Sequence, residues 1–156
     1  MTPIHLSIAL AEIGQAEIPG PGNNPRIAEY LKSVGLPGRD SIPHCAAFAN
    51  WVVEGGDISD IYGTIGTGSG LARSFLTWGY EIKRPILGCI VVIRRGVPDL
   101  TKPYLKRKGH VGFYLDHSRG FIRILGANQG DRVGVNAYAS ARLLSYRWHK
   151  HWGVSV

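Results

Sequence analysis

Cys45 lies where a thiol can become a nucleophile. It precedes an apolar stripe at helical spacing that includes Phe48, Ala49 and Val52, so we expect it in the first turn of a helix. Unpaired backbone N–H groups and the positive end of the helix dipole stabilise a thiolate there. The same spacing also fits a small core residue, because free cysteines are often buried. Cys45 is therefore a candidate nucleophile with a structural alternative.

His110 is the candidate base. It opens an expected strand just after a basic loop, and a strand end is a rigid mount for an imidazole that titrates near neutral pH. The structural alternative is a solvated histidine beside that loop. His44 is a second, less favoured candidate for the base.

Asn128 is the candidate for the third catalytic role, because an amide oxygen beside an imidazole fixes its tautomer and orientation. A two-residue turn at Ser118 and Arg119 would place Ala127 opposite His110. Asn128 reaches the face of His110 only with a one-residue bulge near Gly126 or a five-residue loop. Gln129 and Asp131 are close enough to compete for the role, and an ordinary turn residue is the structural alternative.

The elements that must position these residues divide into a helical first part and a β-rich second part. Helices are expected over 4–18, from Asn24 as N-cap to 34, around Cys45 with Asp40 or Ser41 as cap and Pro43 in the first turn, and over 71–78. Strands are expected over 88–94, 110–116, 121–125 and 143–148. Helices followed by antiparallel strands predict an α+β domain.

Three segments carry a family resemblance: 42–51 (IPHCAAFANW), 109–114 (GHVGFY) and 125–129 (LGANQ). They resemble the CHAP/NlpC-type superfamily of papain-like cysteine amidohydrolases and peptidases. The segments 17–20 and 24–27 resemble a compact bacterial and phage branch of it. The resemblance implies one papain-like domain over residues 1–156, with N-terminal helices packed on a small antiparallel sheet.

The resemblance also implies an activity. It makes Cys45 the nucleophile, His110 the base and Asn128 the orienting residue of a peptidoglycan hydrolase that needs no cofactor and no metal. The bond cut is an amide of the stem peptide or the N-acetylmuramoyl-L-alanine link, as in phage endolysins. His44 stands where this branch usually has Trp, and it can line the site, donate to the oxyanion or be solvated.

Charge indicates the class of partner. The chain of 156 residues has a formal net charge of +7, which favours a polyanionic partner. We expect peptidoglycan and the anionic cell envelope rather than nucleic acid, and a monomer. The first 25 residues contain no Lys or Arg, and the longest apolar run, 86–93, is too short to cross a bilayer. We therefore expect synthesis in the cytoplasm without a signal peptide and action at the bacterial cell wall.

Three other functions remain open. His149 and His151, combined with His110 or His117, allow a zinc hydrolase with incomplete ligand spacing. A papain-like acyltransferase and a non-catalytic basic binding module would keep the same fold. Cys89 is expected to be inert core, because it lies in an apolar strand run.

Overall fold

Helices come first along the chain and strands follow, so the predicted α+β class is confirmed. The structure, a computed structural model, describes residues 1–58 and 63–153. The α-helices are α1 (Ile4–Ala11), α2 (Pro25–Ser33) and α3 (Cys45–Val53). Short 3₁₀ helices are Gly56–Ile58, η2 (Ala72–Thr77), Tyr104–Lys106, Ser140–Arg142 and Lys150–Trp152.

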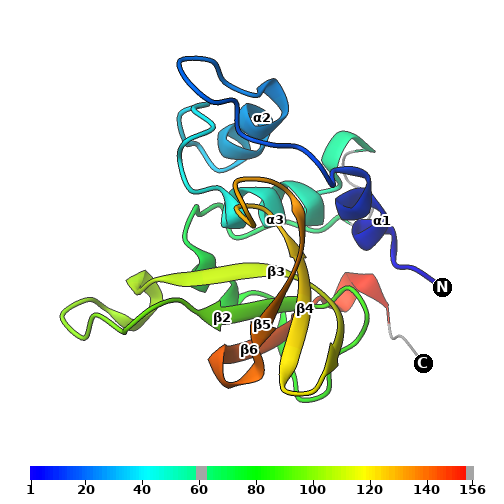
Figure 1. Cartoon of the computed structure of the whole chain (residues 1–156). Helices are drawn as coiled ribbons and strands as arrows, with labels where there is room; N and C mark the ends of the chain where they lie inside the picture. Colours follow the sequence, from blue (N-terminus) through cyan, green and yellow to red (C-terminus); the bar gives the residue numbers. More distant parts are fainter. Residues whose placement is uncertain (59–62, 154–156) are drawn as a thin grey trace.

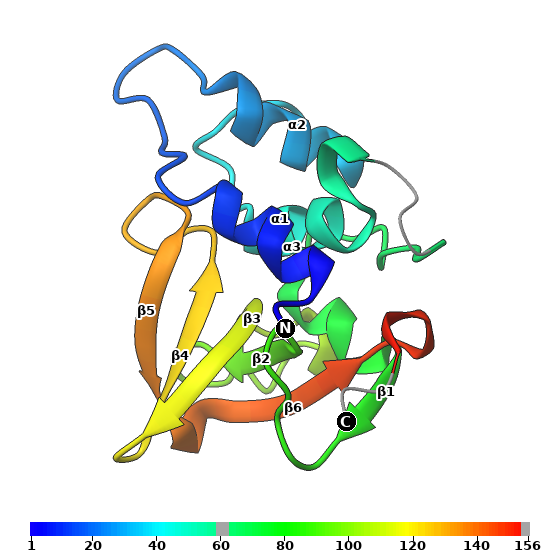
Figure 2. The ribbon, with the colours of Figure 1, turned by 90° about the vertical axis from the view of Figure 1, so that its right-hand side faces the viewer.

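The strands form one antiparallel sheet of six strands in the order β1-β6-β2-β3-β4-β5. Their bounds are β1 (Tyr80–Ile82), β2 (Ile90–Arg94), β3 (Gly109–Ser118), β4 (Phe121–Gly126), β5 (Gly134–Ala139) and β6 (Leu143–Trp148). The sheet is strongly curved, and the α-helices lie together on one side of it (Figures 1 and 2). β3 and β4 thus run beside α3, where the candidate residues are.

The core lies on both faces of the curved sheet. On the helix side, α3 is completely buried, and Phe48 packs against Tyr30 of α2 and Phe113 of β3. On the other side, Cys89, Tyr114 and Trp148 belong to a second buried cluster. Burial of α3 on all sides holds its first residue rigidly against the sheet.

The first helix is shorter than the expected 4–18 and ends at Ala11. Long-range pairing replaces it: the Gly14 N–H donates to Val133 O at 3.0 Å, and the Glu17 N–H donates to Asp131 O at 3.0 Å. Gly14 has a φ of +99°, which suits glycine and ends the helical path. This short pairing ties the chain after α1 to the segment after β4.

The cap expected for the third helix is wrong. α3 begins at Cys45 with His44 at the N-cap position and no side-chain cap, and Pro43 precedes the helix. The carboxylate of Asp40 instead accepts the backbone N–H groups of Ile18 and Asn24, each at 2.8 Å. The Asn24 cap of α2 is confirmed, since its side chain accepts from the first turn of that helix.

The β3–β4 hairpin turns one residue later than expected. Ser118 pairs with Phe121, and the turn residues Arg119 and Gly120 both have positive φ, the pattern of a tight two-residue hairpin turn. The register shifts between Tyr114 and Asp116, so the extra residue lies in β3 and not near Gly126. β1 and β5 were not predicted. No helix of the described residues is long and apolar enough to cross a membrane.

Candidate functional site

Cys45 is the first residue of α3, and its side chain is almost entirely buried. Burial raises the pKa of the thiol. The backbone N–H of Val111 and the charge of Arg95 oppose this and lower the pKa, and the backbone N–H groups of Ala46 and of Cys45 itself act in the same direction. The sulfur therefore lies among donors that favour its anion, at a helix start that no side chain caps.

His110 is the second residue of β3, and its ring is completely buried. Burial lowers its pKa to about 4, because a charged ring would lose its hydration. The imidazole is thus neutral at neutral pH, the form that accepts a proton. The interpretation of His110 as a solvated residue is wrong.

Gln129 determines which nitrogen of His110 carries the proton. Its Nε2 donates to the carbonyl oxygens of Ile124 at 3.0 Å and Gly134 at 2.7 Å, so its Oε1 must face the ring. Oε1 lies 2.9 Å from His110 Nε2, which must then donate. His110 Nδ1 keeps its lone pair, and it has no hydrogen-bond partner among the described residues.

Asn128 makes no hydrogen bond to the imidazole of His110 within the described chain, and its competitor Gln129 makes that contact instead. Asn128 has a φ of +57°, its Oδ1 accepts the backbone N–H of His44, and its Nδ2 donates to Glu17 Oε1 at 3.3 Å. The left-handed backbone at Asn128 directs its side chain to the residue before Cys45, and the next side chain, that of Gln129, reaches the ring. Asn128 therefore holds the backbone at the N-cap position of α3. Asp131 makes no hydrogen bond to His110 within the described part of the chain.

Cys45 and His110 are brought to the same place but are not hydrogen-bonded to each other in the described chain. Val111 connects them: it follows His110 in β3, and its backbone N–H acts on the thiol of Cys45 and lowers the pKa. Such contacts are often loose in a free enzyme and tighten when substrate binds. The arrangement has a thiol and a base with a free lone pair on adjacent elements.

Tyr138 of β5 also belongs to this centre. Its hydroxyl lies 3.4 Å from His110 Nε2, and the two rings have centroids 5.3 Å apart. Burial raises the pKa of the phenol. Sequence reasoning missed Tyr138 because it missed β5, whose side chains are mostly exposed or half-buried and show no apolar stripe.

His44 is fully buried, so its interpretation as a solvated residue is wrong. Its Nδ1 lies 2.9 Å from Ile42 O, and burial lowers its pKa. The negative charges of Asp40 and Asp131 oppose the effect of burial and raise this pKa.

A cavity of about 400 Å³ opens on Cys45. Pro43 and the segment Gly70–Ala72 line it together with basic side chains. We call these side chains the basic wall, which consists of Arg95, Lys106, Arg107 and Lys108. A substrate in this cavity therefore lies near several cations.

The glycine-rich segment 63–70 packs against α3, and its last residue, Gly70, lines the cavity. The backbone N–H of Gly68 donates to Asn50 Oδ1 at 3.2 Å, which ties the segment to α3. A Cβ at Gly66 would lie 2.1 Å from that same oxygen, so only glycine permits this approach.

The other chemical candidates lie elsewhere. Cys89 is completely buried in the second core cluster, and burial raises its pKa to about 12, as expected for inert core. The rings of His149 and His151 meet edge to face at the last 3₁₀ helix, and no three His, Cys, Asp or Glu side chains of the described residues form a metal-ligating group. The zinc alternative gains no support from this geometry.

No family model and no curated protein matches the chain.

Proposed function

We propose that the chain is a cysteine hydrolase that cleaves an amide bond of bacterial peptidoglycan, with Cys45 as nucleophile, His110 as base and Gln129 as the residue that orients the base. The observation that carries the proposal is the neutral, buried imidazole of His110. Gln129 accepts its Nε2–H, and its Nδ1 lone pair is available one residue before Val111, whose backbone N–H lowers the pKa of the Cys45 thiol.

The first half of the reaction follows from these positions. When substrate enters the cavity, the thiol proton of Cys45 passes to His110 Nδ1, and the sulfur attacks the amide carbonyl carbon. The negative oxygen that forms is stabilised by the unpaired N–H groups at the start of α3. The His44 N–H takes no part, because Asn128 already accepts it.

The second half returns the enzyme to its initial state. The imidazolium donates its proton to the leaving nitrogen, the carbon–nitrogen bond breaks, and an amine departs. Water then attacks the thioester, with His110 accepting its proton. The carbon–sulfur bond breaks, an acid leaves, and the thiol is restored.

The peptidoglycan substrate rests on the resemblance to CHAP/NlpC-type enzymes and on charge. A net charge of +7 suits the anionic polymers of a cell envelope. The papain-like fold and an endolysin-like setting belong to the same proposal, and so does action at the cell wall.

The test is digestion of purified sacculi, with mass spectrometry of the soluble fragments. Cys45→Ala should abolish their release, whereas Cys89→Ala, which removes the other thiol from a closed core, should leave it unchanged per folded molecule. Intact stem peptides indicate an amidase, and split stem peptides or cross-links indicate an endopeptidase. If sacculi of several wall types release no Cys45-dependent fragments, the proposal is wrong.

A further inference from the structure

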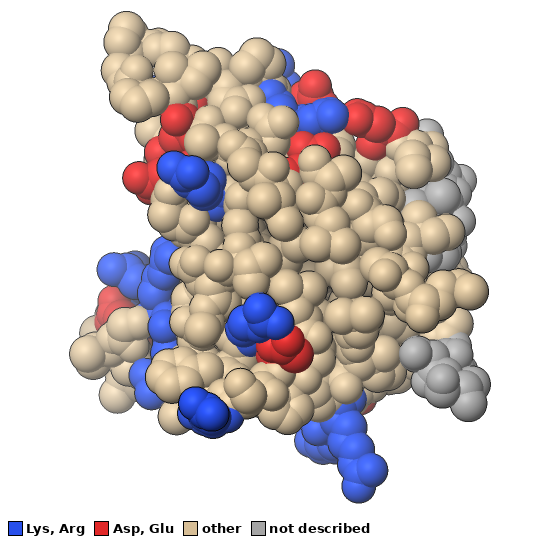
Figure 3. All heavy atoms as spheres, turned by 45° about the vertical axis from the view of Figure 1, so that its right-hand side comes forward, with Lys and Arg blue, Asp and Glu red and all other residues tan. Residues whose placement is uncertain are grey.

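The charged side chains that line the cavity beside Cys45 are all positive. Its basic wall supplies four cations, and none of the described residues that line it is acidic. None of the four cations forms an ion pair within the described residues. Figure 3 shows Lys and Arg gathered along one edge of the molecule, on the side to which the loop between β2 and β3 extends in Figure 1. The charge of this wall is therefore available to a ligand.

Arg95 is the cation of this wall that follows the strand paired with His110. It directly follows β2, whose last two residues pair with Gly109 and His110 of β3. Its charge acts on Cys45, on His110 and on Tyr138, and it lowers the pKa of all three groups. Its side chain is exposed and makes no hydrogen bond within the described chain. A free guanidinium thus borders the position where the scissile amide must lie.

The wall is held in place by a buried cation behind it. Arg73 of η2 is buried, and its Nε and Nη2 donate to Lys108 O at 3.1 and 3.0 Å. Its guanidinium also lies over the ring of Tyr104, at 5.0 Å. Gly109 fits closely against it, since a Cβ there would lie 3.1 Å from Arg73 Cγ. These contacts of Arg73 therefore fix the position of the loop that carries Lys106 to Lys108.

We propose that Arg95 binds a carboxylate of the substrate, so that the enzyme prefers an amide bond with a free carboxylate within one residue of the bond that is cut. The proposal rests on the proposed function and specifies its substrate class. A guanidinium presents two parallel N–H donors that match a carboxylate, and a carboxamide offers it only one acceptor oxygen and no charge.

The test uses two synthetic peptides built around the bond identified by the fragments from sacculi. They are identical except that one has a free carboxylate beside the scissile amide and the other a carboxamide. The wild-type enzyme should cleave the carboxylate peptide about 10- to 100-fold faster in kcat/KM, the range for a hydrogen-bonded charged group. Arg95→Gln should lose most of this preference, measured as the ratio of kcat/KM for the two peptides with the same enzyme preparation, whatever its rate on the carboxamide peptide alone.

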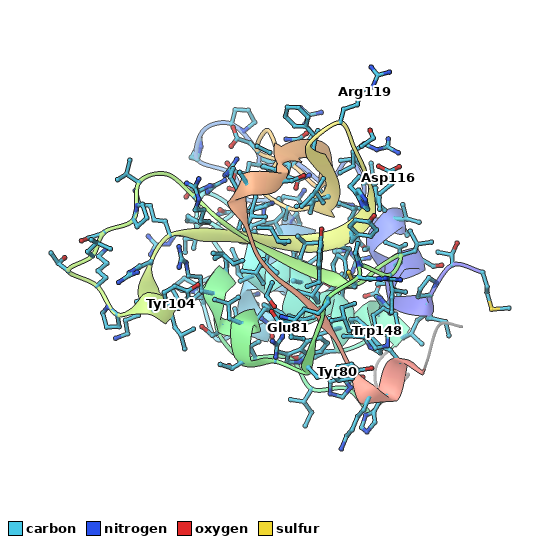
Figure 4. The ribbon with its side chains drawn as sticks, turned by 90° about the horizontal axis from the view of Figure 1, so that it is seen from below. Tyr80, Glu81, Tyr104, Asp116, Arg119 and Trp148 are labelled. Carbon is cyan, nitrogen blue, oxygen red and sulfur yellow. The ribbon has the colours of Figure 1, made fainter. Side chains whose placement is uncertain are left out.

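Arg119→Gln is the matched control. It removes the same charge at the opposite end of β3 from the loop of Tyr104 (Figure 4), and it should keep the full preference. Equal cleavage of both peptides by the wild-type enzyme overturns the carboxylate site and leaves the hydrolase intact. Retention of the preference by Arg95→Gln, with its loss in Lys106→Gln or Lys108→Gln, overturns the assignment to Arg95. Absence of Cys45-dependent fragments from sacculi would instead refute the proposed function.

Discussion

The surroundings of the two cysteines differ in what they leave open. Both thiols are buried, burial raises the pKa of both, and each has a buried histidine nearby. His110 precedes Val111, whose backbone N–H lowers the pKa of Cys45, and His5 contacts the carbonyl of Gly88, the neighbour of Cys89, at 2.8 Å. Cys45, however, lines a cavity and begins a helix, whereas Cys89 is enclosed in the core. Burial and a nearby imidazole do not make a site; access and unsatisfied donors do.

Alkylation tests the difference in access between the two thiols most directly. With the folded protein, iodoacetamide should modify Cys45 at least about 10³-fold faster than Cys89, because a core thiol reacts only when the protein opens. Peptide mapping by mass spectrometry at successive times measures both rates in one sample. Equal rates would show that the cavity gives the sulfur of Cys45 no special access.

Three completely buried imidazoles, those of His5, His44 and His110, make stability depend on pH, because burial lowers the pKa of each. The pKa of His5 and of His110 falls from 6.5 to about 4 on folding, so the unfolded chain binds more protons between these values. The free energy of unfolding should therefore fall as the pH drops from 6.5 to 4, by up to about 3 kcal/mol for each of these two histidines, and His44 acts in the same direction. Urea unfolding at pH 7, 6 and 5 measures it.

His5→Gln isolates the contribution of His5, because glutamine can still donate to the carbonyl of Gly88 and does not titrate. This variant should depend less on pH than the wild type over the same range, because the contributions of His44 and His110 remain. A free energy of unfolding of the wild type that is constant from pH 7 to pH 5 would contradict the burial of these rings as neutral groups.

Gln129 is a further difference between the surroundings of the two cysteines, because it gives His110 a fixed tautomer. Gln129→Ala should lower kcat about 10- to 100-fold on sacculi by removing the acceptor of His110 Nε2–H. Asn128→Ala should have a smaller effect on kcat and should lower the free energy of unfolding by about 1 kcal/mol, because His44 loses its acceptor. Rates are compared per folded molecule, from circular dichroism. A larger loss of kcat in Asn128→Ala would restore Asn128 to the orienting role.

The smallest expected effect on activity comes from removing the side-chain cap of α2. Asn24 caps α2, whereas the start of α3 at Cys45 has no side-chain cap. Asn24→Ala should cost about 1–2 kcal/mol of unfolding free energy and leave kcat unchanged. Thermal unfolding and the sacculus assay measure the two quantities. A drop in kcat would mean that α2 helps to shape the site.

Local signals in the sequence were sufficient for much of the fold. The cap at Asn24, the bounds of β6, Cys45 at a helix start and His110 near a strand start all follow from residue types and short-range spacing. Each of these features is decided within a few residues of itself. The same holds for Cys89, whose apolar neighbours in the chain already indicate burial.

The features that were missed depend on distant contacts. α1 ends early because the segment after it pairs with Val133, and Asp40 caps no helix because it binds Ile18 and Asn24. The choice between Asn128 and Gln129 depends on one left-handed residue and on a bulge on the partner strand. No local propensity distinguishes those two neighbouring amides.

The buried guanidinium of Arg73 has a consequence for how the cleft responds to ionic strength. It supports the wall through neutral carbonyl oxygens, shielded from water, so dissolved ions have no opposite charge to screen there. The exposed cations in front of it attract anions through solvent, and that attraction weakens as salt is added. Added salt should therefore raise KM and leave kcat nearly constant: the attraction that fills the cleft is screened, while the shape of the cleft is preserved.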